Sequence, residues 1–529
     1  MYYSGLVNGE TAPEVPPSVS TTATTTSAIG SYPITLIGGS AANYTLTLQD
    51  GTLTILDAFT SFQRRYFIFT ELTDNSVSGA TADPDHDGIA NLLEYAFALD
   101  PRHAGRAGLP AASFTTASGQ RYLTIAYTQA KLASDLSYAV EASADLASWS
   151  SATPVVVSTT DLGDTESVLV RDTVAATGAS RRFLRISVAG PGSTLTTVPV
   201  GFVGLPTLAN SDTLVSLPLA RPSVYEDTLA SVSGAVLTVS GTPGWTANQF
   251  VKSLPSQPDT YYVQFKSGAA TGHFYTVTAN AAGTLTVDWN GETSGVVGGD
   301  QFELIPYWTL GTLFPATDAG VSFTASTSSL LRNTELLFPD LTSVGINLPA
   351  ASTYYFFNGA WRKVGQPATT SFDSTVLTPD SYFLQRNKAA ASQLTIMGSV
   401  VTGPLAAAII AQGGSTKQDN PIALRFGGTV TLAQSNLVAS GAFQASSSSL
   451  LRKDELYVFD NTASGINKPA AATYYFFNGA WRKVGSAATL DFGADAVFTP
   501  GTGVILRKAG TGAGNPAQDY FWIYNVTGL

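Results

Sequence analysis

A thirteen-residue segment, TYYFFNGAWRKVG, occurs at residues 353–365 and again, letter for letter, at residues 473–485. In each copy two β-prone runs flank an Asn-Gly pair, which predicts a hairpin because both residues of such a turn adopt positive φ. The surrounding residues 328–365 align with 448–485 at a constant offset of 120. Two copies predict a pair of β units, since a solenoid needs at least three.

Both faces of this hairpin are aromatic, and two interpretations follow. In the first, both faces are buried, because large aromatic side chains form core more often than binding surface. In the second, one face is exposed and each copy offers a platform for a sugar or a partner protein. The residues of that platform would be Tyr354, Trp361 and Lys363 in the first copy and Tyr474, Trp481 and Lys483 in the second.

A second element shared by the copies is LLR-x-x-E, which contains Arg332 and Glu335 and, 120 residues later, Arg452 and Glu455. Histidine is absent from both copies. We therefore expect structural ion pairs here rather than catalytic groups.

The segment DPDHDGIANLLE, residues 83–94, has the spacing of a calcium-binding loop. Carboxylates occupy positions 1, 3 and 5, a glycine occupies the sharp turn at position 6, and a glutamate occupies position 12. The predicted Ca²⁺ ligands are Asp83, Asp85, Asp87, the carbonyl of Ile89, Asn91 and Glu94. The alternative is an acidic turn that caps the following helix without an ion.

This segment resembles the calcium loops of EF-hands, dockerins and thrombospondin type 3 repeats. Position 8, where paired EF-hands carry a branched apolar residue, is Ala90, and no second loop is visible in the sequence. We therefore expect a static site at a joint between helices rather than a calcium sensor. Its affinity would suit the millimolar calcium found outside cells.

Short alternating strands, broken by Gly, Pro and Asn, fill most of the remaining sequence and predict a mainly β, multidomain fold of β-sandwich or Ig-like modules. One short helix–calcium loop–helix insertion interrupts them. The expected segments are 1–58, a partial Ig-like module; 59–106, the helix–calcium loop–helix joint; 107–191, a fibronectin-like or Ig-like sandwich; 192–318, a β-rich domain; 319–404, repeat A; 405–440, connecting strands; and 441–529, repeat B.

Two of these regions resemble known families. SGLVNGETAP and NYTLTLQDGTLTIL place residues 3–57 close to the C-terminal part of the bacterial MBG module, an Ig-like repeat of surface proteins. Its opening strands are missing, so we expect the true N-terminus to lie upstream. Residues 195–529, with their duplicated LLR…YYFFNGAWRKVG units, resemble a secreted, β-rich repeat family of unknown function. This second resemblance implies secretion and no mechanism.

Composition narrows the possible functions. A net charge of −11 without a basic cluster argues against nucleic-acid binding, and the absence of cysteine excludes disulfides and thiol chemistry. Neither a signal peptide nor an apolar run of membrane-spanning length is visible. Only three histidines are present, and no catalytic motif surrounds them.

The expected function is therefore non-catalytic: a secreted or cell-surface structural or adhesive protein with a calcium-stabilised joint. Its partner would be a surface glycan or another surface protein. The alternative is a carbohydrate-binding accessory protein or, less favoured, a glycan-active enzyme.

Overall fold

The computed structural model describes residues 1–106, 108–177, 179–253, 256–292 and 295–524. The protein is mainly β, and the paired strands of its sheets run antiparallel. The predicted fold class, a multidomain β protein with a short helical insertion, is confirmed. None of the helices in these ranges is long and apolar enough to cross a bilayer.

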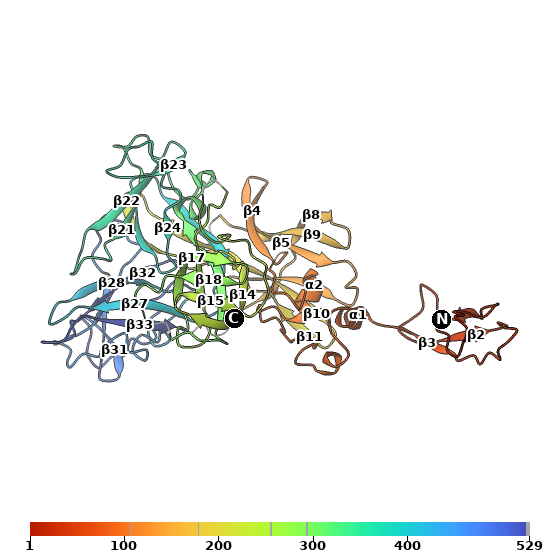
Figure 1. Cartoon of the computed structure of the whole chain (residues 1–529). Helices are drawn as coiled ribbons and strands as arrows, with labels where there is room; N and C mark the ends of the chain where they lie inside the picture. The colour runs from red at the N-terminus through yellow and green to blue at the C-terminus, as the bar shows by residue number, and fades with distance from the viewer. Residues whose placement is uncertain (107, 178, 254–255, 293–294, 525–529) are drawn as a thin grey trace.

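The N-terminal module is a three-stranded sheet that lies apart from the rest of the chain (Figure 1). Its strands, in the order β1-β2-β3, are β1 (Ser18–Thr21), β2 (Gly30–Ile37) and β3 (Gly51–Ile55). Apolar side chains of the sheet, such as Val19 and Leu53, are exposed. The buried hydrophobic clusters found among the described residues contain no member of this module.

The helical segment and the strands after it form a β-sandwich. The helices are α1 (Ala58–Tyr66), the 3₁₀ turn η1 (Glu71–Thr73) and α2 (Asn91–Phe97). The first sheet, in the order β4-β5-β9-β8, contains β4 (Ala111–Ala117), β5 (Gln120–Ala130), β9 (Thr165–Ala175) and β8 (Val155–Asp161). The second sheet, in the order β26-β12-β10-β6-β7, contains β26 (Ser392–Ser399), β12 (Val200–Thr207), β10 (Arg181–Gly190), β6 (Ser137–Ser143) and β7 (Ser150–Ser151), and β11 (Ser193–Thr196) pairs with β10.

Both α-helices contribute to the core of this sandwich. Phe59 of α1 and Leu92 and Phe97 of α2 are buried in one cluster with Leu123 of β5 and Ile186 of β10. The burial of these apolar side chains stabilises the packing of the helices on the strands. The predicted joint at residues 59–106 is therefore part of the sandwich and not a separate spacer between modules.

A closed barrel follows in the sequence. Its strands, in the order β14-β15-β18-β17-β16-β19, are β14 (Tyr225–Ser233), β15 (Val236–Val239), β18 (Thr284–Val287), β17 (Phe274–Ala281), β16 (Tyr261–Phe265) and β19 (Gln301–Pro306). Alternate side chains such as Phe302 and Leu304 fill its interior, as the period of two in a strand requires.

The two sequence repeats form two five-stranded sheets with the same strand order. The first, β13-β25-β21-β22-β23, contains β13 (Ser211–Ser216), β25 (Tyr382–Asn387), β21 (Thr334–Pro339), β22 (Ala350–Phe357) and β23 (Ala360–Lys363). The second, β28-β32-β29-β30-β31, contains β28 (Gln418–Ala423), β32 (Gly503–Lys508), β29 (Glu455–Val458), β30 (Ala472–Phe477) and β31 (Ala480–Lys483). A strand pair also accompanies each sheet, β12 with β26 in the first copy and β27 (Leu405–Ala411) with β33 (Gln518–Tyr524) in the second.

The structural repeat is therefore larger than the predicted units 319–404 and 441–529. The first copy begins at β12, and the barrel is inserted after β13, before the short elements β20 (Trp308–Thr309), α3 (Leu310–Leu313), η2 (Ala316–Asp318) and β24 (Val376–Leu377). The predicted connecting strands at 405–440 include β27 and β28, which pair with β33 and β32 of the second copy.

The two copies are joined by equivalent hydrogen bonds, in which an aspartate of one copy accepts from a backbone N–H of the other. Asp212 of β13 binds Arg386 at 2.8 Å and accepts a hydrogen bond at 2.7 Å from the backbone N–H of Asn467, which belongs to the other copy. The second copy repeats this arrangement, with Asp419 binding Arg507 and the N–H of Asn347.

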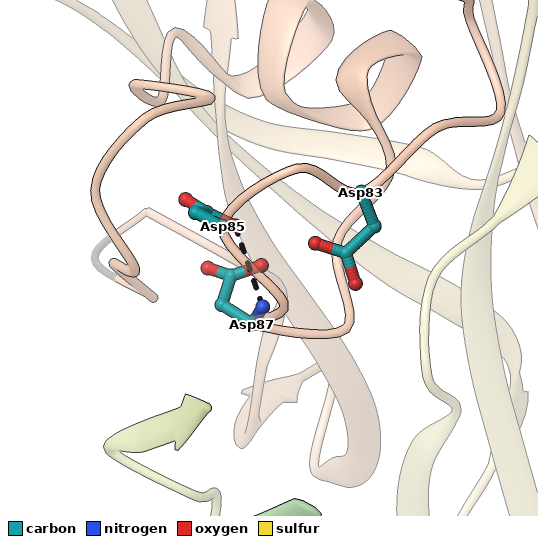
Figure 2. A group of neighbouring side chains, drawn as sticks. All are labelled: Asp83, Asp85 and Asp87. Carbon is teal, nitrogen blue, oxygen red and sulfur yellow. Dashed lines mark hydrogen bonds between the residues drawn. The ribbon is translucent and has the colours of Figure 1, made fainter. Parts of the chain in front are cut away.

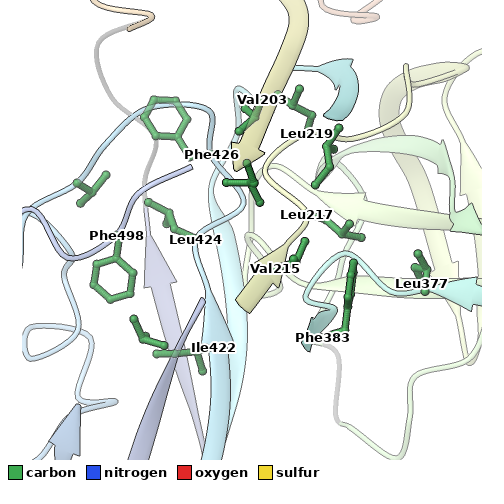
Figure 3. Packing of buried hydrophobic residues seen from close by; sticks show 14 of the residues in the cluster. Val203, Val215, Leu217, Leu219, Leu377, Phe383, Ile422, Leu424, Phe426 and Phe498 are labelled. Carbon is green, nitrogen blue, oxygen red and sulfur yellow. The ribbon is translucent and has the colours of Figure 1, made fainter. Parts of the chain in front are cut away.

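A single hydrophobic cluster joins the two copies. Figure 3 shows Val215 and Phe383 of the first copy near Ile422 and Leu424 of the second, and all four side chains belong to one buried cluster. Burial of this shared surface makes the copies one folded body.

The repeated hairpin has the predicted register. Phe356 pairs with Trp361 across the turn, and Asn358 and Gly359 both have positive φ, 49° and 75°. The second copy has the same pairing.

The exposed aromatic platform predicted on this hairpin is wrong. The rings of the platform are buried: Tyr354 is 6 %, Trp361 1 %, Tyr474 4 % and Trp481 4 % exposed. The Nε1 of Trp361 donates to the carbonyl of Phe314 at 3.0 Å, and the ring packs against Phe323. Lys363 and Lys483 lie over the rings of Tyr354 and Tyr474, at 5.6 Å and 5.5 Å. The core interpretation is confirmed for this face of the hairpin, whereas on the other face Tyr355 is buried and Val364 is exposed.

The ion pairs predicted in the LLR-x-x-E elements are confirmed. Arg332 binds Glu335 at 2.5 Å, and Arg452 binds Glu455 at 2.7 Å. Each arginine also lies over a hairpin tyrosine of its own copy.

Candidate metal centre

The acidic loop immediately before α2 brings three carboxylates together. Asp83, Asp85 and Asp87 each have a carboxylate oxygen within 4.8 Å of those of the other two. Figure 2 shows Asp83 on one side of the loop and the side chains of Asp85 and Asp87 on the other.

The backbone of the loop bends so that these side chains converge. His86 and Gly88 have positive φ, 63° and 80°, which turns the chain sharply at two places. The N–H of Gly88 donates to Asp83 Oδ2 at 3.0 Å, and the N–H of Ile89 donates to Asp87 Oδ1 at 2.9 Å. The sharp turn predicted at position 6 of the motif is therefore present.

Glu94 and Asn91, the other predicted side-chain ligands, lie in the first turn of α2, outside this group of three carboxylates. Glu94 is 1 % exposed, and neither oxygen of its carboxylate has a hydrogen-bond partner within the described residues. Asn91 uses its Nδ2 to donate to the carbonyls of Val77 and Gly79, both at 2.9 Å, and its Oδ1 has no partner there either. Two further buried oxygens, Asp83 Oδ1 and Asp85 Oδ2, also have no hydrogen-bond partner among the described residues.

A buried acceptor without a donor destabilises the fold, because it has lost its hydrogen bonds to water and has gained none in their place. The cost is largest for carboxylates. All the orphaned atoms at this site are oxygens, and oxygens are the ligands that Ca²⁺ prefers. The residues therefore fit a bound calcium ion.

The crowding of carboxylates raises their pKa values. Burial, and then repulsion from Asp87 and Asp83, raises the pKa of Asp85 to about 8. Burial, followed by repulsion from Asp85, raises the pKa of Glu94 to about 10. Burial raises the pKa of Asp87 to about 6, although the N–H of Gly105 and the charge of Arg106 oppose the shift. These groups need a nearby cation to be ionised together at neutral pH.

Calcium affinity is expected to increase as pH rises from 6 to 8, because the ion must displace the protons of Asp87 and Asp85.

The stability of the fold should also depend on pH. A carboxyl whose pKa is raised by folding stabilises the fold at low pH, and this contribution is lost as pH rises through the pKa of the folded state. The metal-free protein should therefore become less stable from about pH 4 to 10, because the raised pKa values extend to about 10 at Glu94, while the calcium-loaded protein should not. Calorimetric titration and thermal melts across this range measure both effects. A calcium affinity that does not change with pH would contradict the assignment.

The loop is also held against the barrel. Arg106 donates through Nη1 to the carbonyl of Asp87 at 2.5 Å and to Glu226 Oε2, on β14 of the barrel, at 3.1 Å. Lys266 of the barrel binds the other oxygen of Glu226. A Cβ added to Gly88 would lie 2.9 Å from Glu226 Oε2, so the turn of the loop contacts this carboxylate directly.

These contacts were not predicted from the sequence. Arg106 and Glu226 are 120 residues apart, and neither belongs to a recognisable motif. Only the folded arrangement of sandwich and barrel brings them to the loop.

Comparison with known protein families supplies a match at the N-terminal module. Residues 1–54 match the MBG domain of the YGX type. The match covers β1 and β2 and most of β3, so this sheet is an MBG-like module. Comparisons with curated proteins and with solved structures found no match.

Proposed function

We propose that this protein is a non-catalytic structural or adhesive protein of the cell exterior, in which a calcium ion bound by residues 83–94 fixes the barrel against the sandwich. The observation that carries the proposal is the position of the loop. The same residues that converge for an ion are joined through Arg106 to Glu226 of the barrel. An ion at this place stabilises the loop and, through it, the contact between the two bodies.

Several features support a location outside the cell. Extracellular calcium is millimolar, which saturates sites of modest affinity. The MBG-like module at residues 1–54 suits a surface protein, and it lies at the far end from the duplicated sheets (Figure 1). In this arrangement the duplicated sheets and the barrel form the part that meets a glycan or another surface protein.

Two of the three histidines, His86 and His103, lie in settings that favour a role without catalysis. His103 is exposed and lies 3.2 Å from Asp100, and His273 packs against the ring of Phe521. His86 lies inside the acidic loop at a position that offers no calcium ligand. His273 Nδ1 also lies 3.4 Å from the hydroxyl of Tyr275, which donates to Glu292.

The substitution Arg106→Gln tests the link between the loop and the barrel. It removes charge-assisted hydrogen bonds to Asp87 and Glu226, each worth about 1.5–3 kcal/mol. We expect calcium affinity to fall about tenfold or more, together with the melting temperature of the calcium-loaded protein. Limited proteolysis should then cut between sandwich and barrel even when calcium is present.

The matched control is Arg102→Gln in the same segment. Arg102 pairs with Glu71 at the surface, and such pairs contribute about 0–1 kcal/mol. If the two variants bind calcium equally well and resist proteolysis equally, the proposed brace between loop and barrel is wrong.

A further inference from the structure

A cavity of about 320 Å³ lies where the sandwich, the barrel and the end of β26 meet. The calcium loop contributes Gly88 and Ile89 to its wall, the barrel contributes Glu226 and Glu303, and the segment after β26 contributes Val400. Its volume falls within the range of pockets that bind small molecules.

One wall of the cavity includes Glu226 and Glu303, which belong to a row of polar side chains on the outside of the barrel. Glu226 of β14, Glu303 of β19 and Gln264 of β16 are neighbours across three adjacent strands. Their sequence neighbours Phe302 and Leu304 point into the barrel, so alternation directs the polar groups outward, toward the sandwich.

Glu303 is the middle member of this row, and its carboxylate accepts no hydrogen bond from another described residue. Glu226 binds Arg106 and Lys266, and Gln264 donates to the carbonyl of Pro404 at 3.2 Å. Burial raises the pKa of Glu303, and the charges of Lys266 and Arg106 oppose this shift. A carboxylate that faces a cavity in this way is a free acceptor for a ligand.

The charges around the cavity balance. Arg106 and Lys266 oppose Glu226 and Glu303, and the remaining cation, Arg221, is neutralised by two hydrogen bonds to Asp259, at 2.6 Å and 3.2 Å. A charged ligand would disturb this balance, whereas a neutral ligand would not.

The opposite wall is mainly apolar. It is formed by side chains of the sandwich and of the segment after β26: Ile89, Leu93, Leu109, Val198, Val200, Val400 and Val401. A ligand for this cavity therefore needs one apolar face and one face of hydrogen-bonding groups.

We propose that this cavity binds a single neutral sugar residue. A sugar hydroxyl donates to the Glu303 carboxylate, and neighbouring hydroxyl oxygens accept from Lys266 and Arg106. The C–H face of the ring then packs on the apolar wall. This site differs from the hairpin platform, whose rings are buried in the core.

The test is saturation-transfer NMR and calorimetry of the full chain in millimolar calcium, with glucose, galactose, mannose and N-acetylglucosamine as probes. We expect at least one of these sugars to bind at a single site. Glu303→Gln keeps the shape of the side chain and removes the anionic acceptor, so it should weaken binding about tenfold. Ser223→Trp, which adds a ring at the cavity wall, should abolish binding.

The matched control is Glu292→Gln, since Glu292 accepts from the hydroxyl of Tyr275 elsewhere on the barrel and should not affect sugar binding. Melting temperatures of all variants show whether each one folds. The proposal is overturned if the folded wild-type chain binds none of the four sugars. It is equally overturned if folded Glu303→Gln or Ser223→Trp binds as tightly as the wild type.

Discussion

Lys508→Met is expected to lower the free energy of unfolding by about 3–5 kcal/mol, because it leaves the carboxylate of Asp454 buried without its cation. Both side chains are 0 % exposed, and Lys508 Nζ lies 2.6 Å from Asp454 Oδ2 and 2.7 Å from the carbonyl of Ala442. Burial lowers the pKa of Lys508, and the charge of Asp454 opposes this shift. Chemical denaturation of the full chain in saturating calcium measures the loss.

The first copy supplies the control for this experiment. Where the second copy has Asp454 and Lys508, the first has the neutral residues Thr334 and Asn387, which are paired across β21 and β25 and equally buried. The double variant Asp454→Thr with Lys508→Asn should therefore be much more stable than Lys508→Met, since no charge is left buried without a partner. A double variant as unstable as the single one would show that packing, rather than charge, determines the loss.

Trp361→Ala is expected to cost about 3–5 kcal/mol, as is typical of deleting a large buried aromatic side chain. The ring is 1 % exposed, and the carbonyl of Phe314 would lose its indole donor. The equivalent change Trp481→Ala should have a similar effect. Both losses appear as lower denaturation midpoints.

Lys363→Ala is the control on the same hairpin, because Lys363 is only partly buried and its substitution should change stability by less than about 1 kcal/mol. If Trp361→Ala leaves stability unchanged but removes binding to a glycan array, the ring acts at a surface and its assignment to the core is wrong.

The parts of the fold that could be predicted from sequence are those set by local rules. The Asn358-Gly359 turn determines the hairpin register, since both residues tolerate positive φ. The spacing of Asp83, Asp85 and Asp87 similarly specifies a loop whose carboxylates converge. In both cases the residues that matter lie within about a dozen positions of one another.

The features of the fold that could not be predicted from sequence depend on contacts between residues far apart in the chain. The alternating pattern of a strand does not say which strand it pairs with, so β13 could not be recognised as the partner of β25, some 170 residues later. Because the barrel is inserted between β13 and β25 in the sequence, the full length of the repeat could not be recognised. Aromatic residues on both hairpin faces were ambiguous for the same reason, because the residues that bury Trp361 include Phe314, which lies outside the predicted repeat A.

The position of the acidic loop also depends on contacts between residues far apart in the chain. Its ligands are local, but its position against Glu226 requires the barrel. Sequence spacing therefore predicted a site that fits an ion without showing that the site lies between two bodies of the molecule.

Calorimetric titration of the metal-free full chain with calcium chloride tests the central claim most directly. The proposed brace predicts one calcium ion bound per chain at pH 8, with binding abolished or severely weakened in Glu94→Gln, which lacks the carboxylate at position 12 of the loop. The absence of saturable heat in the folded wild-type chain would contradict it. Equal binding by wild type and Glu94→Gln would show that any ion binds elsewhere.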